Sequence, residues 1–223
     1  GTTYYLAELY RHTEAAFLVE PIERAIGHFG DLIDAAQCTG TTAEGREFRC
    51  VIDKGKKVAH LGSTALAAVA LAEYQRATGS NRFEEMLRGM AEFLLHMQRK
   101  DGSFAHQYLL DKGTIDHRAE LLYYSGEAAL GLARAYRVTG DERYLHASER
   151  ALDWLVSWYD FFLGDLFYGE EHWTCIAAEA VLPEVKKERY WRFCRGYGAF
   201  LRQHQADPGD FQDQRDWAGS YYF

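Results

Sequence analysis

Two short segments of the sequence bring together side chains that can transfer protons. Residues 123–127 read Tyr-Tyr-Ser-Gly-Glu, and residues 170–173 read Glu-Glu-His-Trp. Cleavage of a glycosidic bond needs a protonated carboxylic acid on one side of the sugar and an ionised carboxylate on the other. The pattern therefore predicts Glu171 as a general acid and Glu127 as a base or nucleophile.

A purely structural explanation competes with this hypothesis. Both segments open a predicted helix, where acidic residues cap free amides and complement the helix dipole, each worth up to ~1 kcal/mol. This accounts well for one glutamate per helix. It accounts less well for His172 and Trp173, because a histidine at a helix N-terminus opposes the dipole. Both explanations stay open on the sequence.

Other polar and aromatic residues fall near the same helix starts. Asp116 and His117 come shortly before the helix that carries Glu127, and they have no counterpart in the repeats described below. The aromatic residues can stack on a sugar ring or simply pack the end of the fold. The side chains expected to orient the two glutamates or to contact a substrate are Asp116, His117, Tyr124, His172, Trp173, Tyr168 and Trp217.

The elements that position these residues repeat along the chain. Residues 74–83 are repeated 61 positions later as residues 135–144. Both copies have an arginine at the third position, Thr-Gly in the middle and an arginine followed by an aromatic residue at the end. Thr-Gly ends one helix, because glycine adopts the left-handed C′ conformation at little cost. Ser80 and Asp141 are then expected to cap the helix that follows.

Helices of two kinds alternate in these repeats. The segments 62–77, 126–138 and 172–182 are apolar on nearly all sides, which is typical of helices buried on all sides. The helices that follow them carry a single apolar stripe, in the first copy Phe83, Met86, Leu87, Met90, Leu94 and Met97. The stripe returns after 61 and after 107 residues. We therefore predict inner and outer helices in alternation, with residues 3–17 and 21–37 as one more pair.

The links between these helices differ in length. Links from inner to outer helices are short, whereas those from outer to inner helices are long: 38–61, 99–123, 159–171 and 205–223. All long links then lie at one end of the fold, and loops on a rigid scaffold often carry function. The first long link contains a predicted β-hairpin near 47–60 that turns at Lys54-Gly55.

One repeat resembles a known motif. The residues Gln98, Gly102 and Phe104 are similar to the Gln…Gly-x-Trp repeat of terpenoid cyclases, and Gln205, Gly209 and Phe211 form a degraded copy. The alternating hairpins also resemble the six-hairpin glycosidases and sugar epimerases. Both resemblances imply an all-α fold, an α/α toroid of inner and outer helices. Such a toroid has about six hairpins and the sequence shows four, so we expect residues 1–223 to form one domain that is incomplete relative to a six-hairpin barrel.

The same resemblance implies a role for the repeated glutamine. In the terpenoid cyclase pattern this side chain ties the end of an outer helix to the start of the next inner helix, and the aromatic ring packs beneath it. We expect this of Gln98 and Phe104. The Asp-x-Asp-Asp motif of triterpene cyclases is absent, which argues against isoprenoid cyclisation.

Composition excludes several function classes. The formal charge is −8 and no basic run occurs, so no nucleic-acid partner is expected. Phosphate-binding loops, the Gly-x-Ser-x-Gly elbow and His-Glu-x-x-His are absent. We expect no cofactor and no membrane span. The chain opens at Gly1 with no charged-then-apolar signal segment, and this opening is uninformative about export. The compartment stays open on the sequence, with the cytoplasm slightly favoured.

The cysteines give no metal site. Four are present, at 38, 50, 175 and 194, with no Cys-x-x-Cys pair. Cys175 and His172 share a helix face, but two ligands do not make a zinc site. Cys194 is expected in the core. Cys38 and Cys50 could approach each other across the hairpin insert, and free thiols are equally compatible with the sequence.

Three functions are compatible with this pattern. The first is a carbohydrate-active enzyme, a hydrolase, lyase or epimerase, with paired carboxylates in an acidic aromatic cleft at the long-loop end. The second is a non-catalytic toroid that binds a peptide, a lipid or a partner domain. The third is an isoprenoid-handling protein without cyclase chemistry, which would need a mouth lined by phenylalanine and leucine.

Overall fold

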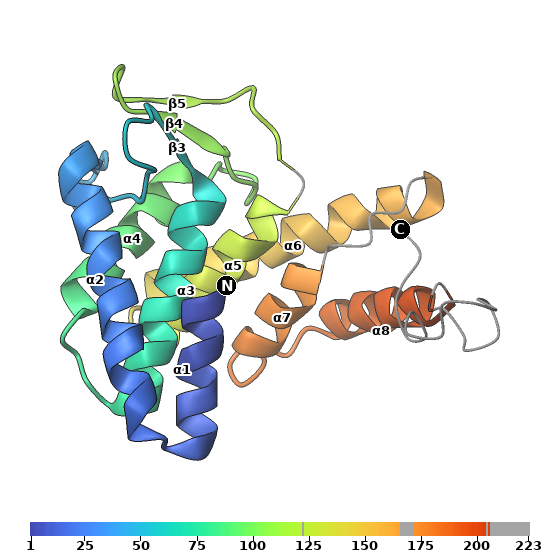
Figure 1. The fold of residues 1–223 in the computed structure, drawn as a ribbon. Helices are drawn as coiled ribbons and strands as arrows, with labels where there is room; N and C mark the ends of the chain where they lie inside the picture. Colours follow the sequence, from blue (N-terminus) through green and yellow to red (C-terminus); the bar gives the residue numbers. More distant parts are fainter. Residues whose placement is uncertain (122, 166–171, 204, 206–223) are drawn as a thin grey trace, which may run out of the picture.

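The helices follow one another in four hairpins (Figure 1). The computed structural model of the chain describes residues 1–121, 123–165, 172–203 and 205. The helices of these ranges are α1 (Thr2–Thr13), α2 (Val19–Ala36), α3 (Leu61–Thr78), α4 (Glu84–Met97), α5 (Tyr124–Thr139), α6 (Glu142–Asp165), α7 (His172–Val181) and α8 (Glu188–Gln203), with one 3₁₀ turn at Ala16–Leu18.

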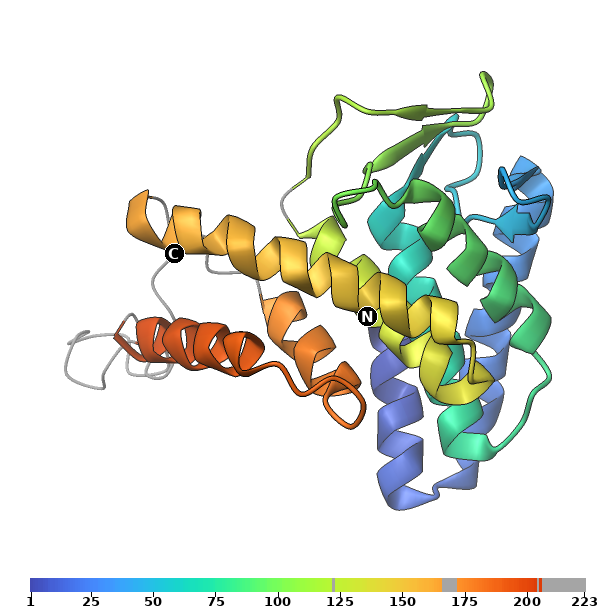
Figure 2. The same cartoon turned by 180° about the vertical axis from the view of Figure 1, so that it is seen from behind.

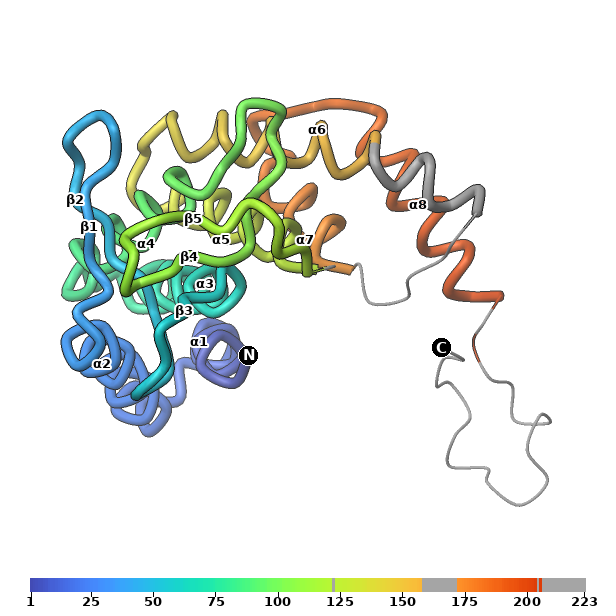
Figure 3. The backbone as a smooth tube through the Cα atoms, turned by 90° about the horizontal axis from the view of Figure 1, so that it is seen from above, coloured from blue at the N-terminus to red at the C-terminus, as the bar shows by residue number. Residues whose placement is uncertain are grey.

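Odd-numbered and even-numbered helices occupy different layers. Figure 3 shows α1, α3, α5 and α7 on the inside of a curved row and the even-numbered helices outside it. The inner helices pack on one another in chain order, and each outer helix packs on its inner neighbours. From behind, α6 lies across α5 (Figure 2). The predicted alternation of inner and outer helices is therefore confirmed.

Small residues bring the two central inner helices close together. Helix α3 is buried along most of its length because alanine and other apolar residues cover nearly all its sides. On α5, Gly131 faces α3 so closely that a methyl group added there would lie 3.2 Å from the carbonyl oxygen of Ala65. The inner layer is thus held by close backbone approach rather than by large side chains.

The predicted glycine helix ends are also found. Gly79 and Gly140 follow α3 and α5 with φ angles of 71° and 68°, the left-handed conformation that glycine adopts at little cost. Asp141 caps α6 as predicted, because its carboxylate accepts a hydrogen bond from the Arg143 amide at 3.1 Å. The predicted cap by Ser80 is wrong, because α4 begins only at Glu84 after Phe83, and the Ser80 hydroxyl accepts from the Arg82 amide at 3.4 Å in the loop before it. Each Thr-Gly therefore ends an inner helix, and the chain then turns toward the outer helix that follows.

Five short strands lie in the first two long links. They are β1 (Thr39–Thr41), β2 (Glu47–Arg49), β3 (Val58–His60), β4 (Gln107–Leu109) and β5 (Thr114–Asp116). Strand β1 pairs with β2, and the second sheet has the antiparallel order β3-β4-β5. The predicted strands near 47–60 exist, but they pair differently from the prediction, because β2 and β3 belong to separate sheets.

The turn between these two strands was predicted correctly. Gly55 has a φ of 78°, and the Lys56 amide donates to the Asp53 carbonyl at 2.9 Å. The strands on either side leave the turn toward different partners. The Cys38–Cys50 disulfide holds β2 beside β1, whereas β3 joins the strand pair of the second long link. The first two long links are therefore joined above the inner helices.

The repeat glutamine joins two outer helices. The Gln98 amide donates to the carbonyl oxygens of Ala147 at 2.8 Å and Gly102 at 3.2 Å, and its oxygen accepts from Arg150 at 2.6 Å. Phe104 is completely buried, as predicted. The expected tie to the next inner helix is wrong, because Ala147 and Arg150 lie on α6. Gln205 is exposed, and Gly209 and Phe211 of the second copy lie outside the described residues.

All four cysteines form disulfides. Cys38 pairs with Cys50, and Cys175 of α7 pairs with Cys194 of α8. The first pairing was one of two alternatives left open by the sequence. The second was not predicted, because Cys194 was expected as a core thiol. No helix of the described ranges is both long and apolar enough to cross a membrane.

The Cys38–Cys50 disulfide should contribute measurably to stability. It closes a loop with a sequence separation of 12. Loop-closure entropy makes a crosslink of this size worth about 2–3 kcal/mol. We expect the Cys38→Ala/Cys50→Ala double variant to lose about this much free energy of unfolding in urea. Equal midpoints for the variant and the wild type, or free thiols in the unreduced, unfolded wild type, would contradict the pairing.

Candidate active site

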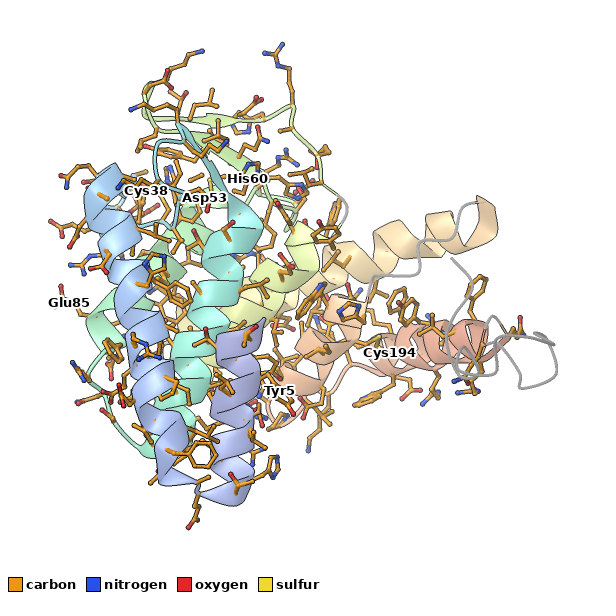
Figure 4. All side chains as sticks on the ribbon, in the orientation of Figure 1. Tyr5, Cys38, Asp53, His60, Glu85 and Cys194 are labelled. Carbon is orange, nitrogen blue, oxygen red and sulfur yellow. A yellow bond between two sulfur atoms is a disulfide. The ribbon has the colours of Figure 1, made fainter. Side chains whose placement is uncertain are left out.

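The N-terminal end of α3 meets the second sheet at one end of the molecule (Figure 1). Strand β3 runs directly into α3, and Figure 4 shows His60 at this junction. The Leu61 amide donates to the His106 carbonyl at 3.0 Å, which ties the start of α3 to the second long link. We call His60, Gly62, His106, Tyr124 and Glu127 the mouth cluster.

Glu127 is the buried acid of the mouth cluster. It lies in the first turn of α5 and is only 4% exposed. Its carboxylate lies against α3, since a methyl group added to Gly62 would be 2.3 Å from Glu127 Oε2. Gly62 thus provides the space that the carboxylate occupies. Burial of this kind is unusual for a glutamate, since glutamates are mostly exposed in folded proteins.

Tyr124 lies at the centre of the mouth cluster. Its ring packs edge-on against His60 and His106, with ring centroids 6.1 and 5.9 Å away. Tyr124 also leans on Gly62, where an added methyl group would lie 2.6 Å from its ring. Burial, with smaller effects of Tyr123 and Glu127, raises the pKa of Tyr124. The phenol therefore stays protonated and can donate a hydrogen bond.

His106 is held in one tautomer. The Leu121 amide donates to its Nδ1 at 2.6 Å, so the ring proton lies on Nε2, which donates to the Ser125 hydroxyl at 3.0 Å. Burial lowers the pKa of His106, and Arg99 acts in the same direction against Glu120. The ring is therefore neutral near pH 7 and fixes the position of Tyr124.

This arrangement is suited to proton transfer on a polar ligand. It combines the buried Glu127 carboxylate and the protonated Tyr124 phenol of the first turn of α5 with the neutral His106 imidazole, which is bonded to Ser125 of the same turn. Glu127 and Tyr124 are three residues apart on α5, so their side chains project on the same side of the helix. A base and a donor on one rigid helix are the kinds of group that general acid–base catalysis uses.

The other predicted site residues are only partly described. Asp116 ends β5, and its Oδ1 accepts from the Arg118 amide at 2.9 Å in the turn that follows. His117 is exposed, with its carbonyl accepting from Arg99 at 3.1 Å. His172 begins α7, with its ring 4.6 Å from that of the half-buried Trp173. The three remaining predicted residues, Glu171, Tyr168 and Trp217, lie outside the described residues.

Two members of the mouth cluster were missed by the sequence analysis. His60 is the single histidine of the first long link, whereas His106 shares the second long link with His117. The pairing of β3 with β4 brings them together, because His60 is opposite Gln107 in that register. The signal in the sequence was the position of His60 directly before a predicted inner helix, and no such signal marked His106. Within the described ranges, no group of three or more metal-binding side chains is present.

Solved structures of similar shape were found by comparison. A family 76 glycoside hydrolase from a bovine Bacteroides thetaiotaomicron strain superposes with a TM-score of 0.68 at 13% identity, over 98% of this chain and 49% of its own. A D-mannose isomerase superposes with a TM-score of 0.66 at 12% identity, over 99% of this chain and 65% of its own. The cellobiose 2-epimerase of Bacillus thermoamylovorans superposes with a TM-score of 0.66 at 10% identity, over 92% of this chain and 60% of its own.

The chain shares the α/α-toroid fold of these solved structures. It spans about half to two thirds of the length of these three structures. No protein-family profile and no curated protein sequence matches it. The likeness therefore establishes the toroid, and the chemistry has to be argued from the residues.

Replacing Gly62 by alanine tests the packing of the mouth cluster. The added methyl group would overlap Glu127 Oε2 and the Tyr124 ring. Overpacking of this kind costs about 1–3 kcal/mol, and we expect a lower melting temperature. The matched control is Gly27→Ala on α2, where nothing lies within 4 Å of the added methyl. This control should gain up to ~1 kcal/mol from helix propensity; two variants of equal stability would contradict the contact.

Buried histidines should make stability depend on pH. Burial lowers the pKa of His106 and of His96, whose ring stacks on Phe48. The unfolded chain therefore binds more protons below the ordinary histidine pKa of ~6.5. Stability is fully present above that pH and is lost as the pH falls.

We expect the urea midpoint to drop between about pH 7.5 and about pH 5.5, before the carboxylates titrate. His96→Phe should reduce this drop. A midpoint that rises toward acid pH would contradict the burial of neutral rings.

Proposed function

We propose that this chain is a carbohydrate-active enzyme whose site is the mouth of the toroid. The observation that carries the proposal is the buried Glu127 carboxylate at the start of an inner helix, packed against Gly62 and beside the Tyr124 phenol. A glutamate that only caps its helix has no need of this burial. The toroid neighbours named as a glycoside hydrolase, an epimerase and an isomerase support a sugar as the substrate.

The residues take the following roles in this proposal. Glu127 is the base or nucleophile, and Glu171, which comes before the inner helix α7 in the sequence, is the general acid. Adjacent packed helices lie about 8–10 Å apart, which leaves a sugar-sized space between their side chains. Tyr124 donates a hydrogen bond to the sugar and Trp173 stacks on it, while Asp116, His117 and His172 orient the reacting groups. Tyr168 and Trp217 contribute further aromatic contacts.

A single NMR experiment tests the function. Wild-type protein is incubated in D₂O with cellobiose, D-mannose and α-1,6-mannotriose, sugars suggested by the names of toroid neighbours. New reducing ends indicate hydrolysis, new anomeric signals at constant chain length indicate epimerisation or isomerisation, and vinyl protons indicate a lyase. Glu127→Gln is the matched control and should give none of these. A wild type that neither converts nor binds any of the sugars would contradict the proposal.

The experiment also separates the other two functions. Saturable binding without conversion would favour a non-catalytic binding or assembly module. The isoprenoid hypothesis required a mouth of phenylalanine and leucine without paired acids. The described mouth instead consists of tyrosine, histidine and glutamate around Gly62, so we leave this hypothesis out of the proposal.

The two disulfides bear on the compartment in which this enzyme works. Structural disulfides persist in oxidising surroundings and are rare where cytosolic thiols keep cysteines reduced. With both cysteine pairs joined, we propose an oxidising compartment in place of the cytoplasm that the sequence favoured.

A further inference from the structure

A cavity lies between the inner helices, at the end of the toroid away from the mouth cluster. It has a volume of about 390 Å³ and is lined by residues of α1, α3, α5 and α7, with Tyr5 of α1 labelled in Figure 4. Arg134, which lines it, follows Glu127 by seven residues on α5 and so lies about 10 Å further along the helix axis. The cavity is therefore distinct from the proposed active site.

Two arginines of this cavity already have carboxylate partners. Arg76 pairs with Glu8 at 2.5 Å and with Glu73 at 2.7 Å, and Arg11 pairs with the other oxygen of Glu8 at 2.7 Å. Burial raises the pKa of Glu73. The neighbouring Arg134 and Arg76 act in the opposite direction, but the pKa stays above its ordinary value. Burial alone would also raise that of Glu8, but hydrogen bonds with Glu73 and Arg11 lower the pKa of Glu8 to about 2. Arg76 and Arg11 are therefore already paired with carboxylates.

Arg134 is not satisfied in the same way. It is buried, with 6% of its surface exposed, and none of its N–H groups makes a hydrogen bond within the described ranges. Its Nε lies 3.1 Å from Glu73 Oε1, but neither atom has hydrogen-bond geometry. Its second acidic neighbour, the exposed Glu179, is 3.7 Å away. A buried guanidinium with unused donors is costly unless an acceptor is supplied.

A second under-paired arginine lies beside it. Arg137 follows Arg134 by three residues on α5, so both side chains lie on the same side of the helix. Arg137 is half-buried, lines the cavity, and forms no ion pair with any described residue. The cavity thus has four arginines against the carboxylates of Glu8, Glu73 and Glu179, an excess of one positive charge.

We infer that this cavity is a binding site for an oxyanion, held by the guanidinium groups of Arg134 and Arg137. A guanidinium presents parallel N–H donors that match a carboxylate or a phosphate. Tyr4 and Tyr5 of α1 line the same cavity and provide aromatic surface for the rest of the ligand. The oxyanion belongs either to a sugar acid or to a phosphate group, and the two sources share the same recognition chemistry.

Calorimetric titration of the intact chain tests this site. The probes are inorganic phosphate, D-glucuronate and the neutral D-glucose. Arg137→Ala removes one guanidinium, and Arg134→Lys keeps the charge but removes the planar donors. The matched control is Arg24→Ala, an exposed arginine of α2. Melting curves confirm that each variant is folded, and Arg137→Ala carries the test should Arg134→Lys fail to fold.

We expect saturable binding of at least one oxyanion by the wild type and by Arg24→Ala. Arg137→Ala should weaken it about tenfold or more, because a charge-assisted hydrogen bond is lost. Tighter binding of glucuronate assigns the site to a sugar acid, and tighter binding of phosphate assigns it to a phosphate group. The inference is overturned if neither oxyanion binds, if glucose binds as tightly as glucuronate, or if Arg137→Ala binds like the wild type.

Discussion

Replacing Glu127 by glutamine is expected to lower turnover about 100-fold or more while the melting temperature stays near that of the wild type. Glutamine keeps the size and shape of the side chain next to Gly62 but cannot accept or release the proton. The loss should appear in kcat more than in KM, since the group acts on the reacting atoms rather than on binding. The measurement is a steady-state rate on the sugar identified by NMR, with a melting curve of the same sample.

A matched glutamate separates catalysis from helix capping. Glu142 is an exposed acidic residue in the first turn of α6, so Glu142→Gln should leave turnover unchanged. Glu171→Gln should behave like Glu127→Gln if the two act as a pair. The account of Glu127 fails if Glu127→Gln melts early but keeps the rate per folded molecule, because the residue would then be a cap.

Removing the ring of Phe104 is expected to cause the largest loss of stability. The ring is completely buried in the joint after α4, where Phe104 and Gln98 form an isolated antiparallel bridge. Truncation of a buried phenylalanine costs about 3–5 kcal/mol in lost burial and residual cavity. The measurement is the free energy of unfolding of Phe104→Ala in urea, with the rate per folded molecule unchanged.

Two companion variants set the scale of this loss. Gln98→Ala should cost about 1–2 kcal/mol, because Ala147 and Gly102 lose a donor and Arg150 loses an acceptor. Phe17→Ala is the matched control, since Phe17 is 76% exposed and should change stability by less than ~0.5 kcal/mol. Equal costs for Phe104→Ala and Phe17→Ala would contradict the joint and the toroid built on it.

The toroid could be predicted because its signals are local. The apolar stripe of α4 and the all-round apolar surface of α3 each lie within one helix, and Gly79 and Gly140 mark the turns between inner and outer helices. Because the same pattern recurs 61 residues later, a hairpin predicted for the first copy also predicts a hairpin for the second. Pairings between distant segments carry no such periodicity, which is why the partners of β2 and β3 and the Cys175–Cys194 disulfide were not predicted.

The candidate site could be predicted in part for the same reason. Tyr124 and Glu127 stand out because they occupy one helix start with chemically useful side chains. His60 and His106 belong to links 46 positions apart, and only the pairing of β3 with β4 brings them beside Tyr124. The burial of Glu127 depends on Gly62 of another helix, a contact between two segments that no single stretch of sequence displays.

A crystal structure of Glu127→Gln with a bound substrate sugar tests the central claim most directly. The account predicts the sugar at the inner-helix mouth, within hydrogen-bond reach of residue 127 and of the Tyr124 hydroxyl, with Glu171 on the opposite side of the reacting carbon. The separation of the two carboxyl positions would then distinguish a retaining hydrolase, at about 5–5.5 Å, from an inverting one, at about 6.5–9.5 Å. A sugar bound elsewhere on the toroid, with residue 127 sealed beneath Tyr124 and out of reach, would contradict the account.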